Sequence, residues 1–331
     1  MQSTISIFKR SGVQKKRRPK VDDFVSTMRL VFKNKVSLTG LIITSVYFII
    51  ALMDYVYPQY LGAGPGIVTS LTRFNGGYLG QGFPVGPTLN KGWWFYLGTT
   101  YANIPLFPAI LSALYIDLGY SLLIVLSGAI IGIFIGTISA YYGGFWDELM
   151  MRITDIFYSI PFLIMAIAFT TILSYSLAKA HAPINGFSLI ALALIIIWWP
   201  TYARLTRSIT LSIKSSRFIE AAVASGSSKM RNVITHIIPN VLSPVFVQIS
   251  LDLGSIVLIF ATVEYLGLGN VIRVTQYTPE LGELISAGQT YLPVGIWWPV
   301  FVPGLFLLIF TVGVNILGDG LRDVLDPKMR R

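Results

Sequence analysis

The stretch EAAVASGSSKMRNVITHIIPN, residues 220–240, lies between two long apolar segments but is too polar to enter a bilayer. A first helix is expected over residues 212–225, because this segment contains neither Pro nor Gly. Gly226 suits the end of that helix, where the chain takes a positive φ, and Ser227 or Ser228 can cap a second helix. The stretch therefore predicts two short helices joined by a tight turn.

The second of these helices carries one apolar stripe, whose members are spaced i, i+3, i+4 and i+7: Met230, Val233, Ile234 and Ile237. We expect it to close at Pro239 and Asn240. Three interpretations compete: a DNA-binding helix-turn-helix, an amphipathic helix lying on lipid, and a docking element for a soluble partner. The apolar segments on both sides tie the stretch to the membrane, which argues against DNA. Small Ala221 and Ala222 beside Glu220 let another surface approach the backbone, which favours docking.

Composition indicates an all-α integral membrane protein. Among the 331 residues 54% are hydrophobic and 12% are charged, and the mean hydropathy is +0.68. Six segments are long and apolar enough to span a bilayer: about 36–57, 119–141, 150–175, 186–204, 241–263 and 294–317. Pro161 is expected to kink the third. The absence of cysteine and the wide separation of His181 and His236 argue against a metal site.

The distribution of charge predicts the topology. With the amino terminus in the cytoplasm, all Lys and Arg lie on the cytoplasmic side except Arg73, Lys91, Lys179 and Arg273. The expected organisation is a basic cytoplasmic tail (1–35), a first transmembrane helix (36–57), an extracytoplasmic segment (58–118), a five-helix core (119–318) with a cytoplasmic loop (205–240), and a cytoplasmic tail (319–331). We expect the basic tail to contact anionic membrane lipid rather than nucleic acid. The outer segment is either a receptor-docking cap or a loop resting on the bilayer.

Polar residues within the apolar segments mark a second candidate site. Asp252 lies near the middle of the fifth segment, where a carboxylate costs roughly 2.5–3.5 kcal/mol. Gln248 and Ser255 share its helix face. This face either lines a translocation path or makes interhelical hydrogen bonds. Asp155, near the start of the third segment, is expected to pair with Arg152.

The spacing Glu220-Ala221-Ala222, three residues, Gly226, nine residues, His236-Ile237-Ile238-Pro239 resembles the EAA loop of ABC importer permeases, in which this loop sits in a cleft of the ATPase subunit. The form His-x-Ile-Pro-Asn is similar to that of the dipeptide/oligopeptide branch. Four further segments resemble the second permease of that branch: YYGGFWDELMMRITDIFYSIP (141–161), WWPTYARLTR (198–207), EYLGLG (264–269) and NILGDGLRDVLDPKMR (315–330). LGTTYANIP (97–105) departs from the family pattern by lacking its charged part.

The resemblance implies a type I importer permease with six spans. Its implied partners are a homologous second permease, two ATPase subunits and an extracytoplasmic substrate-binding protein. ATP and Mg would be bound by the ATPases, and this chain would hold no cofactor. The implied coupling residues are Glu220, Ala221, Ala222, Gly226, His236, Pro239 and Asn240.

Three catalytic signatures are absent from the sequence: it contains no GxxxxGK[ST], HExxH or GxSxG. We therefore expect a transport subunit and not an enzyme. The resemblance implies uptake of short peptides across the cell (plasma or inner) membrane. Oligosaccharides or metal chelates are alternative substrates in the same role. A different class is an ion-coupled secondary transporter that uses Asp252 as its coupling acid.

Overall fold

The structure, a computed structural model, describes residues 34–56, 83–88, 90, 95–100, 104–180, 186–268 and 280–325. Its helices are α2 (Lys35–Val56), α5 (Leu106–Tyr142), α6 (Gly144–Ser159), α7 (Phe162–Lys179), α8 (Gly186–Lys214), α9 (Arg217–Ala224), α10 (Lys229–Asn232), η2 (Val233–Ile237), α11 (Ile238–Tyr265), α12 (Leu281–Gln289), η4 (Leu292–Val294) and α13 (Trp298–Leu325). Within this described part, six helical segments are long and apolar enough to cross a membrane. The all-α, six-span prediction is confirmed.

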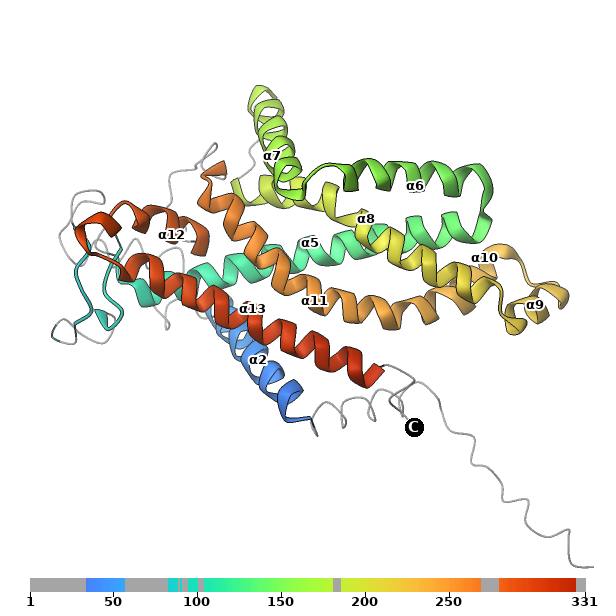
Figure 1. Cartoon of the computed structure of the whole chain (residues 1–331), viewed down its shortest axis with the longest axis horizontal. Coiled ribbons are helices and arrows are strands. Elements are labelled where there is room, and N and C mark those ends of the chain that lie inside the picture. The colour runs from blue at the N-terminus through green and yellow to red at the C-terminus, as the bar shows by residue number, and fades with distance from the viewer. Residues whose placement is uncertain are drawn as a thin grey trace, which may run out of the picture.

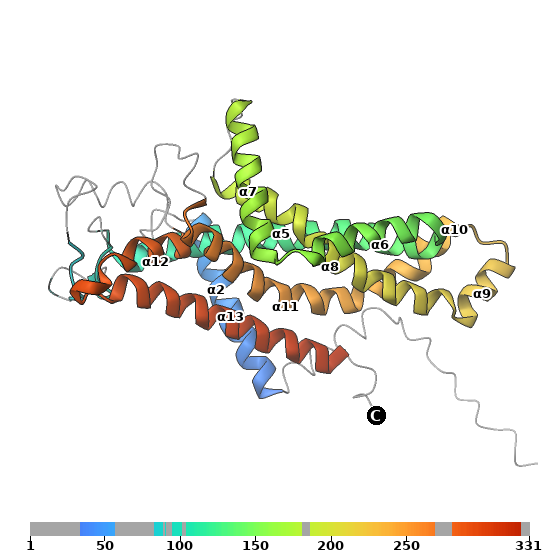
Figure 2. The same cartoon turned by 45° about the horizontal axis from the view of Figure 1, so that its top comes forward.

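Three long helices, α5, α8 and α11, run side by side along the long axis of the molecule (Figure 1). The short helices α9 and α10 lie at one end of this bundle, and α12 lies at the other (Figure 1 and Figure 2). Helix α2 packs against α13, and α7 projects away from the bundle in both views. The polar stretch at residues 220–240 therefore lies at one end of the bundle, remote from α12.

Small residues bring α5 and α8 together. Gly128, Gly132 and Gly136 lie four residues apart on α5, and all three face α8. A Cβ added at Gly132 would lie 2.7 Å from the amide nitrogen of Ala203 and 2.7 Å from the carbonyl oxygen of Trp199. Helices in lipid gain little from hydrophobic burial, so they associate through close backbone packing of this kind.

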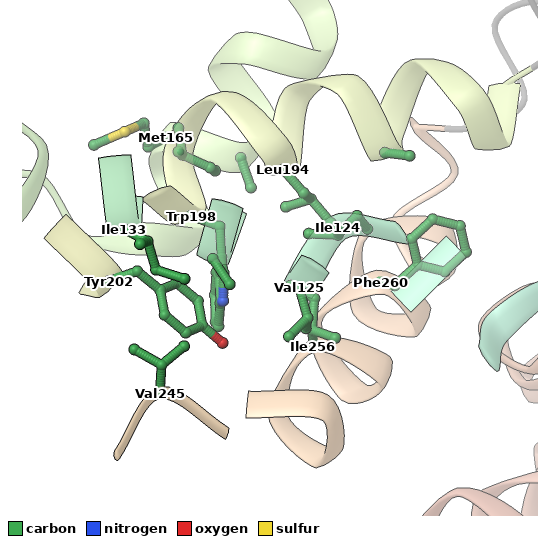
Figure 3. Packing of buried hydrophobic residues seen from close by; sticks show 14 of the residues in the cluster. Ile124, Val125, Ile133, Met165, Leu194, Trp198, Tyr202, Val245, Ile256 and Phe260 are labelled. Carbon is green, nitrogen blue, oxygen red and sulfur yellow. The ribbon is translucent and has the colours of Figure 1, made fainter. Parts of the chain in front are cut away.

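Two apolar clusters fill the bundle. In the first, Trp198 and Tyr202 of α8 pack among side chains of α5 and α11: Val245 lies beside Tyr202, and Ile124 and Phe260 continue the cluster on its other side (Figure 3). The second joins α2, α5, α11, α12 and α13 and includes Leu114, Leu281 and Phe310. Because α5 and α11 contribute to both clusters, they connect the two halves of the bundle.

The second span is longer than expected. Helix α5 begins at Leu106 and not near residue 119. Its 37 residues give a length of about 55 Å, which exceeds the roughly 30 Å of bilayer hydrocarbon. Leu106, Ile110 and Leu114 are buried by neighbouring helices. About the first three and a half turns (residues 106–118) fall in the predicted outer segment, because hydropathy does not distinguish lipid from protein neighbours.

The third span is broken and not merely kinked. Ile160 is extended, with φ −105° and ψ 132°, and Pro161 caps the next helix. A residue before proline avoids the helical region, which explains why α6 ends here. Helix α6 is amphipathic and carries four charged residues, so only α7 has the composition of a span. By contrast, α8 continues through Pro200.

The helices around residues 212–240 also differ from expectation. Helix α8 continues to Lys214, and α9 starts separately at Arg217. The second helix does not end at Pro239 but continues into α11 through the π-helical turn η2, where the amide of Ile238 donates to the carbonyl of Val233. Pro239 lacks the N–H that would donate to the carbonyl four residues earlier. The shift to i−5 hydrogen bonds just before it lets the helix continue through the proline and not end there.

At the carboxyl end, α13 extends to Leu325, and Asp319, Arg322 and Asp323 continue the last span. Residues 1–33 of the predicted basic tail (1–35), most of the outer segment and residues 326–331 lie outside the described residues.

Candidate functional site

The turn between α9 and α10 is built from local signals. Helix α9 closes with the amide of Gly226 donating to the carbonyl of Val223 (2.9 Å) and the amide of Ser227 donating to that of Ala222 (3.0 Å). This is the bonding pattern of a Schellman C-cap, which requires the positive φ of Gly226, here +81°. The hydroxyl of Ser228 then accepts from the amide of Arg231 and caps α10. The predicted cap and turn residues are confirmed.

The α9–α10 element presents small and apolar side chains to its surroundings. Glu220 and Ala221 are exposed, and Ala222 is half-buried. Four larger apolar side chains are also exposed, by 48–59%: Phe218, Val223, Met230 and Ile234. Exposed apolar groups next to small residues form a surface suited to contact with another protein.

The predicted apolar stripe is divided between two environments. Val233 and Ile237 are buried in the core, whereas Met230 and Ile234 are exposed. A helix lying passively on lipid would turn its whole apolar face outward. The division therefore supports a structural attachment on one side and a free surface on the other.

Contacts with the bundle hold the element in place. Ile219 is buried, and Asn232, which is fully buried, donates through Nδ2 to the hydroxyl of Tyr141 on α5 (3.2 Å). The ring of His236 lies 6.3 Å from that of Phe218, between centroids, so this predicted residue helps to position α9. Sequence reasoning missed Asn232 and Tyr141, because nothing local marks two residues 91 positions apart as partners.

Two further predicted coupling residues lie where α10 passes into α11. Pro239 and Asn240 are exposed, and Asn240 donates through Nδ2 to the carbonyl of His236 (2.6 Å). This bond lies within the helix junction, and a coupling role for Pro239 and Asn240 stays a prediction. The surface available to a partner is thus concentrated on α9 and on the exposed side of α10.

A pocket of about 390 Å³ opens between α9 and the adjacent ends of α5 and α8. Its lining residues are Tyr141, Lys214, Ile219, Glu220, Val223 and Ala224. The ammonium of Lys214 lies 5.6 Å from the centroid of the Tyr141 ring and 3.5 Å from the carbonyl oxygen of Ala140. The pocket therefore combines apolar walls with one cation, Lys214, and one carboxylate, Glu220.

The intramembrane polar group is only partly assembled as expected. Asp252 is buried, 7% exposed, and accepts hydrogen bonds from Trp198 Nε1 (3.2 Å) and Gln248 Nε2 (2.7 Å). Ser255, in contrast, is exposed. The bond to Trp198 joins α11 to α8, which supports the interhelical interpretation. A translocation-path role for Gln248, Asp252 and Ser255 stays a prediction.

Ion pairs join α6 to α8. Arg207 donates through Nε and Nη2 to the two carboxylate oxygens of Asp147, each at 2.7 Å. The hydrogen bonds from Arg207 hold the pKa of Asp147 below its usual value. Asp155 pairs with Arg204 (2.8 Å), not with Arg152 as expected. The packing of α6 against α8, and not proximity in sequence, determines which arginine pairs with Asp155.

Arg152 instead pairs with Glu148 at i, i+4 on the same helix. The described residues contain no group of three or more His, Cys, Asp or Glu side chains placed to hold a metal ion.

These features define a class: a multi-pass helical membrane protein from which a positioned helix–turn–helix protrudes at one end. Residues 128–331 match the family described as "Binding-protein-dependent transport system inner membrane component". The chain belongs to this family, which has the type I importer permease fold. The resemblance drawn from the sequence is confirmed.

Individual relatives cover most of the chain. The dipeptide transport system permease protein DppC of Alkalihalophilus pseudofirmus is 33% identical over 298 residues, which is 90% of this chain and 88% of the relative. The probable D,D-dipeptide transport system permease protein DdpC of Escherichia coli is 35% identical over 235 residues, 71% of this chain and 73% of the relative. The glutathione transport system permease protein GsiD of Escherichia coli is 34% identical over 245 residues, which is 74% of this chain and 75% of the relative.

Proposed function

We propose that this chain is one permease subunit of an ABC importer for short peptides, and that α9 and its turn couple it to an ATPase subunit. The observation that carries the coupling is the exposed surface of α9. The turn that follows α9 is fixed by the cap at the end of α9 and the cap at the start of α10, and Asn232 anchors it to α5. The names of the relatives, which refer to dipeptides and glutathione, support the substrate class.

In this mechanism a homologous second permease completes the translocation pathway, and an extracytoplasmic binding protein delivers the substrate. ATP and Mg would bind to two partner ATPases, which would do the hydrolysis, with no cofactor in this chain. Closure of the ATPase dimer would move α9, and α8 and α11 would carry that movement into the bundle, because α9 lies between them in the chain. Both termini would lie in the cytoplasm of a cell (plasma or inner) membrane, as the distribution of Lys and Arg favours.

Purification in mild detergent from native membranes, followed by mass spectrometry, tests the assembly. We expect two ATPase subunits and a second permease to be recovered with the chain. Ala221→Trp should remove the ATPases, because Ala221 is exposed on α9 and bulk there prevents close approach. Ala180→Trp, at an exposed alanine after α7, is the matched control. Recovery of ATPases in undiminished amount with Ala221→Trp would contradict the coupling role.

Uptake into proteoliposomes tests the substrate class. Radiolabelled dipeptide uptake should require ATP and the binding protein, and unlabelled di- and tripeptides should compete with it. Competition by oligosaccharides or metal chelates alone would transfer the same permease role to those substrates. Ion-driven flux by the chain without ATPases would instead favour a secondary transporter that depends on Asp252.

A further inference from the structure

The pocket beside α9 has a distinctive chemistry. The side chain of Ile219 and the ring of Tyr141 are nearly fully buried and supply apolar wall, while Val223 and Ala224 are exposed on α9. Glu220, which also lines the pocket, and Ala221, which does not, are both exposed on the same helix α9. A partner that docks on α9 must therefore either cover this apolar pocket or fill it.

Charge narrows the choice of occupant. Lys214 supplies an ammonium to the pocket, where it is already held against the Tyr141 ring and the Ala140 carbonyl. The lining also carries the Glu220 carboxylate, so it holds one cation and one anion and has no net charge to attract a further cation; a cationic side chain that reached Glu220 would also meet the Lys214 ammonium. An aromatic ring is compatible with it, because the face of a ring attracts a cation and its body suits the apolar wall.

The acid among the lining residues specifies the polar tip of the occupant. Glu220 is exposed, and within the described part of the chain no Lys, Arg or His nitrogen lies within 4.0 Å of its carboxylate. A carboxylate accepts hydrogen bonds only. The hydroxyl of a tyrosine or the indole N–H of a tryptophan would donate to it, whereas phenylalanine would leave it unmatched.

We propose that the pocket between α9, α5 and α8 receives a tyrosine or tryptophan side chain of the ATPase subunit docked on α9. The contact is then reciprocal: the permease inserts α9 into its partner, and the partner inserts one aromatic residue into the permease. This inference rests on the proposed coupling function and specifies the chemistry of the partner.

Single cysteines test whether the pocket is filled, since the natural chain has none. Ala224→Cys places a thiol on the pocket wall, and Ala221→Cys places one on the same helix outside the pocket lining. Maleimide labelling is compared between the isolated chain and the complete transporter. We expect labelling of Ala224→Cys to slow by about tenfold or more in the complex. Protection of Ala221→Cys alone would mean that α9 docks while the pocket stays empty, which overturns the inference but not the proposed function. Protection of neither would overturn both.

A photo-crosslink identifies the occupant. Benzoyl-phenylalanine at position 223, an exposed lining residue, is activated in the complete transporter, and the product is mapped by mass spectrometry. We expect attachment to, or directly beside, a tyrosine or tryptophan of the ATPase. Replacement of that aromatic residue by alanine should restore labelling of Ala224→Cys and leave Ala221→Cys protected. Attachment only to lipid, to this chain or to an ATPase segment without an aromatic residue would refute the proposal.

Discussion

Replacement of Gly226 by valine isolates the conformational requirement of the α9–α10 turn. Gly226 has φ +81°, and no described atom lies within 4 Å of a Cβ built on it, so the substitution adds strain without a clash. A left-handed conformation costs an L-residue about 1–2 kcal/mol, which corresponds to about 5- to 30-fold in the population of the correct turn. Asparagine tolerates this conformation better and should lose less.

The matched control lies at another turn. Gly295 has φ +84° and is equally open, but it follows η4 near the start of α13. Gly295→Val therefore imposes the same backbone strain in a region remote from α9 (Figure 1). If strain alone reduced membrane insertion or stability, both variants would show it.

Peptide-stimulated ATP hydrolysis and uptake in proteoliposomes, normalised to the amount of inserted chain, measure the effect. We expect both activities to decrease in the order glycine, asparagine, valine at position 226, with normal membrane insertion of all three proteins. Gly295→Val should transport at a near-normal rate. Equal transport by Gly226→Val and the wild type would refute the turn requirement. Equal losses at the two positions would show that the effect is not specific to coupling.

Three further predictions concern the bundle. Gly132→Leu should destabilise the protein in detergent by at least about 1–3 kcal/mol in a thermal-shift assay, because the added side chain forces α5 away from α8. Gly119→Leu is the control and should be near neutral, because a Cβ at Gly119 meets no described atom within 4 Å. Asp252→Leu should cost about 1–3 kcal/mol in the same assay by leaving the buried indole N–H without an acceptor; loss of uptake at unchanged stability would support the path interpretation instead. Because Arg207 lowers the pKa of Asp147 in the folded state, their pair stabilises above the ordinary carboxyl value and this contribution is lost as pH falls below it. The difference in melting temperature between wild type and Asp147→Asn should therefore be present at neutral pH, begin to shrink below about pH 4, and vanish only below the lowered pKa of Asp147; a difference independent of pH would exclude this pair as its source.

Local features of the candidate site could be read from the sequence because they depend on neighbouring residues. Gly226 and Ser228 are examples, since a Schellman turn and an N-cap involve residues only a few positions apart. The glycines at 128, 132 and 136 are a local signal that sequence reasoning overlooked, although small residues four apart in an apolar segment are typical of helix contacts.

Partners of charged and polar groups could not be read in this way. Asp155 has Arg152 three positions before it in the sequence, yet it pairs with Arg204 on α8, and Asp252 binds the indole of Trp198 on another helix. These choices depend on how the helices are rotated and how close they lie. No pattern within one helix contains that information.

The sequence by itself determined that this protein crosses a membrane six times, because the length and hydropathy of each segment are set against the fixed thickness of a bilayer. It also determined the family, through a motif whose spacing is local. Only the tertiary structure decided how far α5 extends, where the third span breaks, and that Tyr141 and Lys214 meet α9 around a pocket. Lipid and the protein interior are equally apolar, so hydropathy cannot tell which of the two a side chain contacts. Close packing between helices that are distant in sequence decides this, and it exists only in the folded protein.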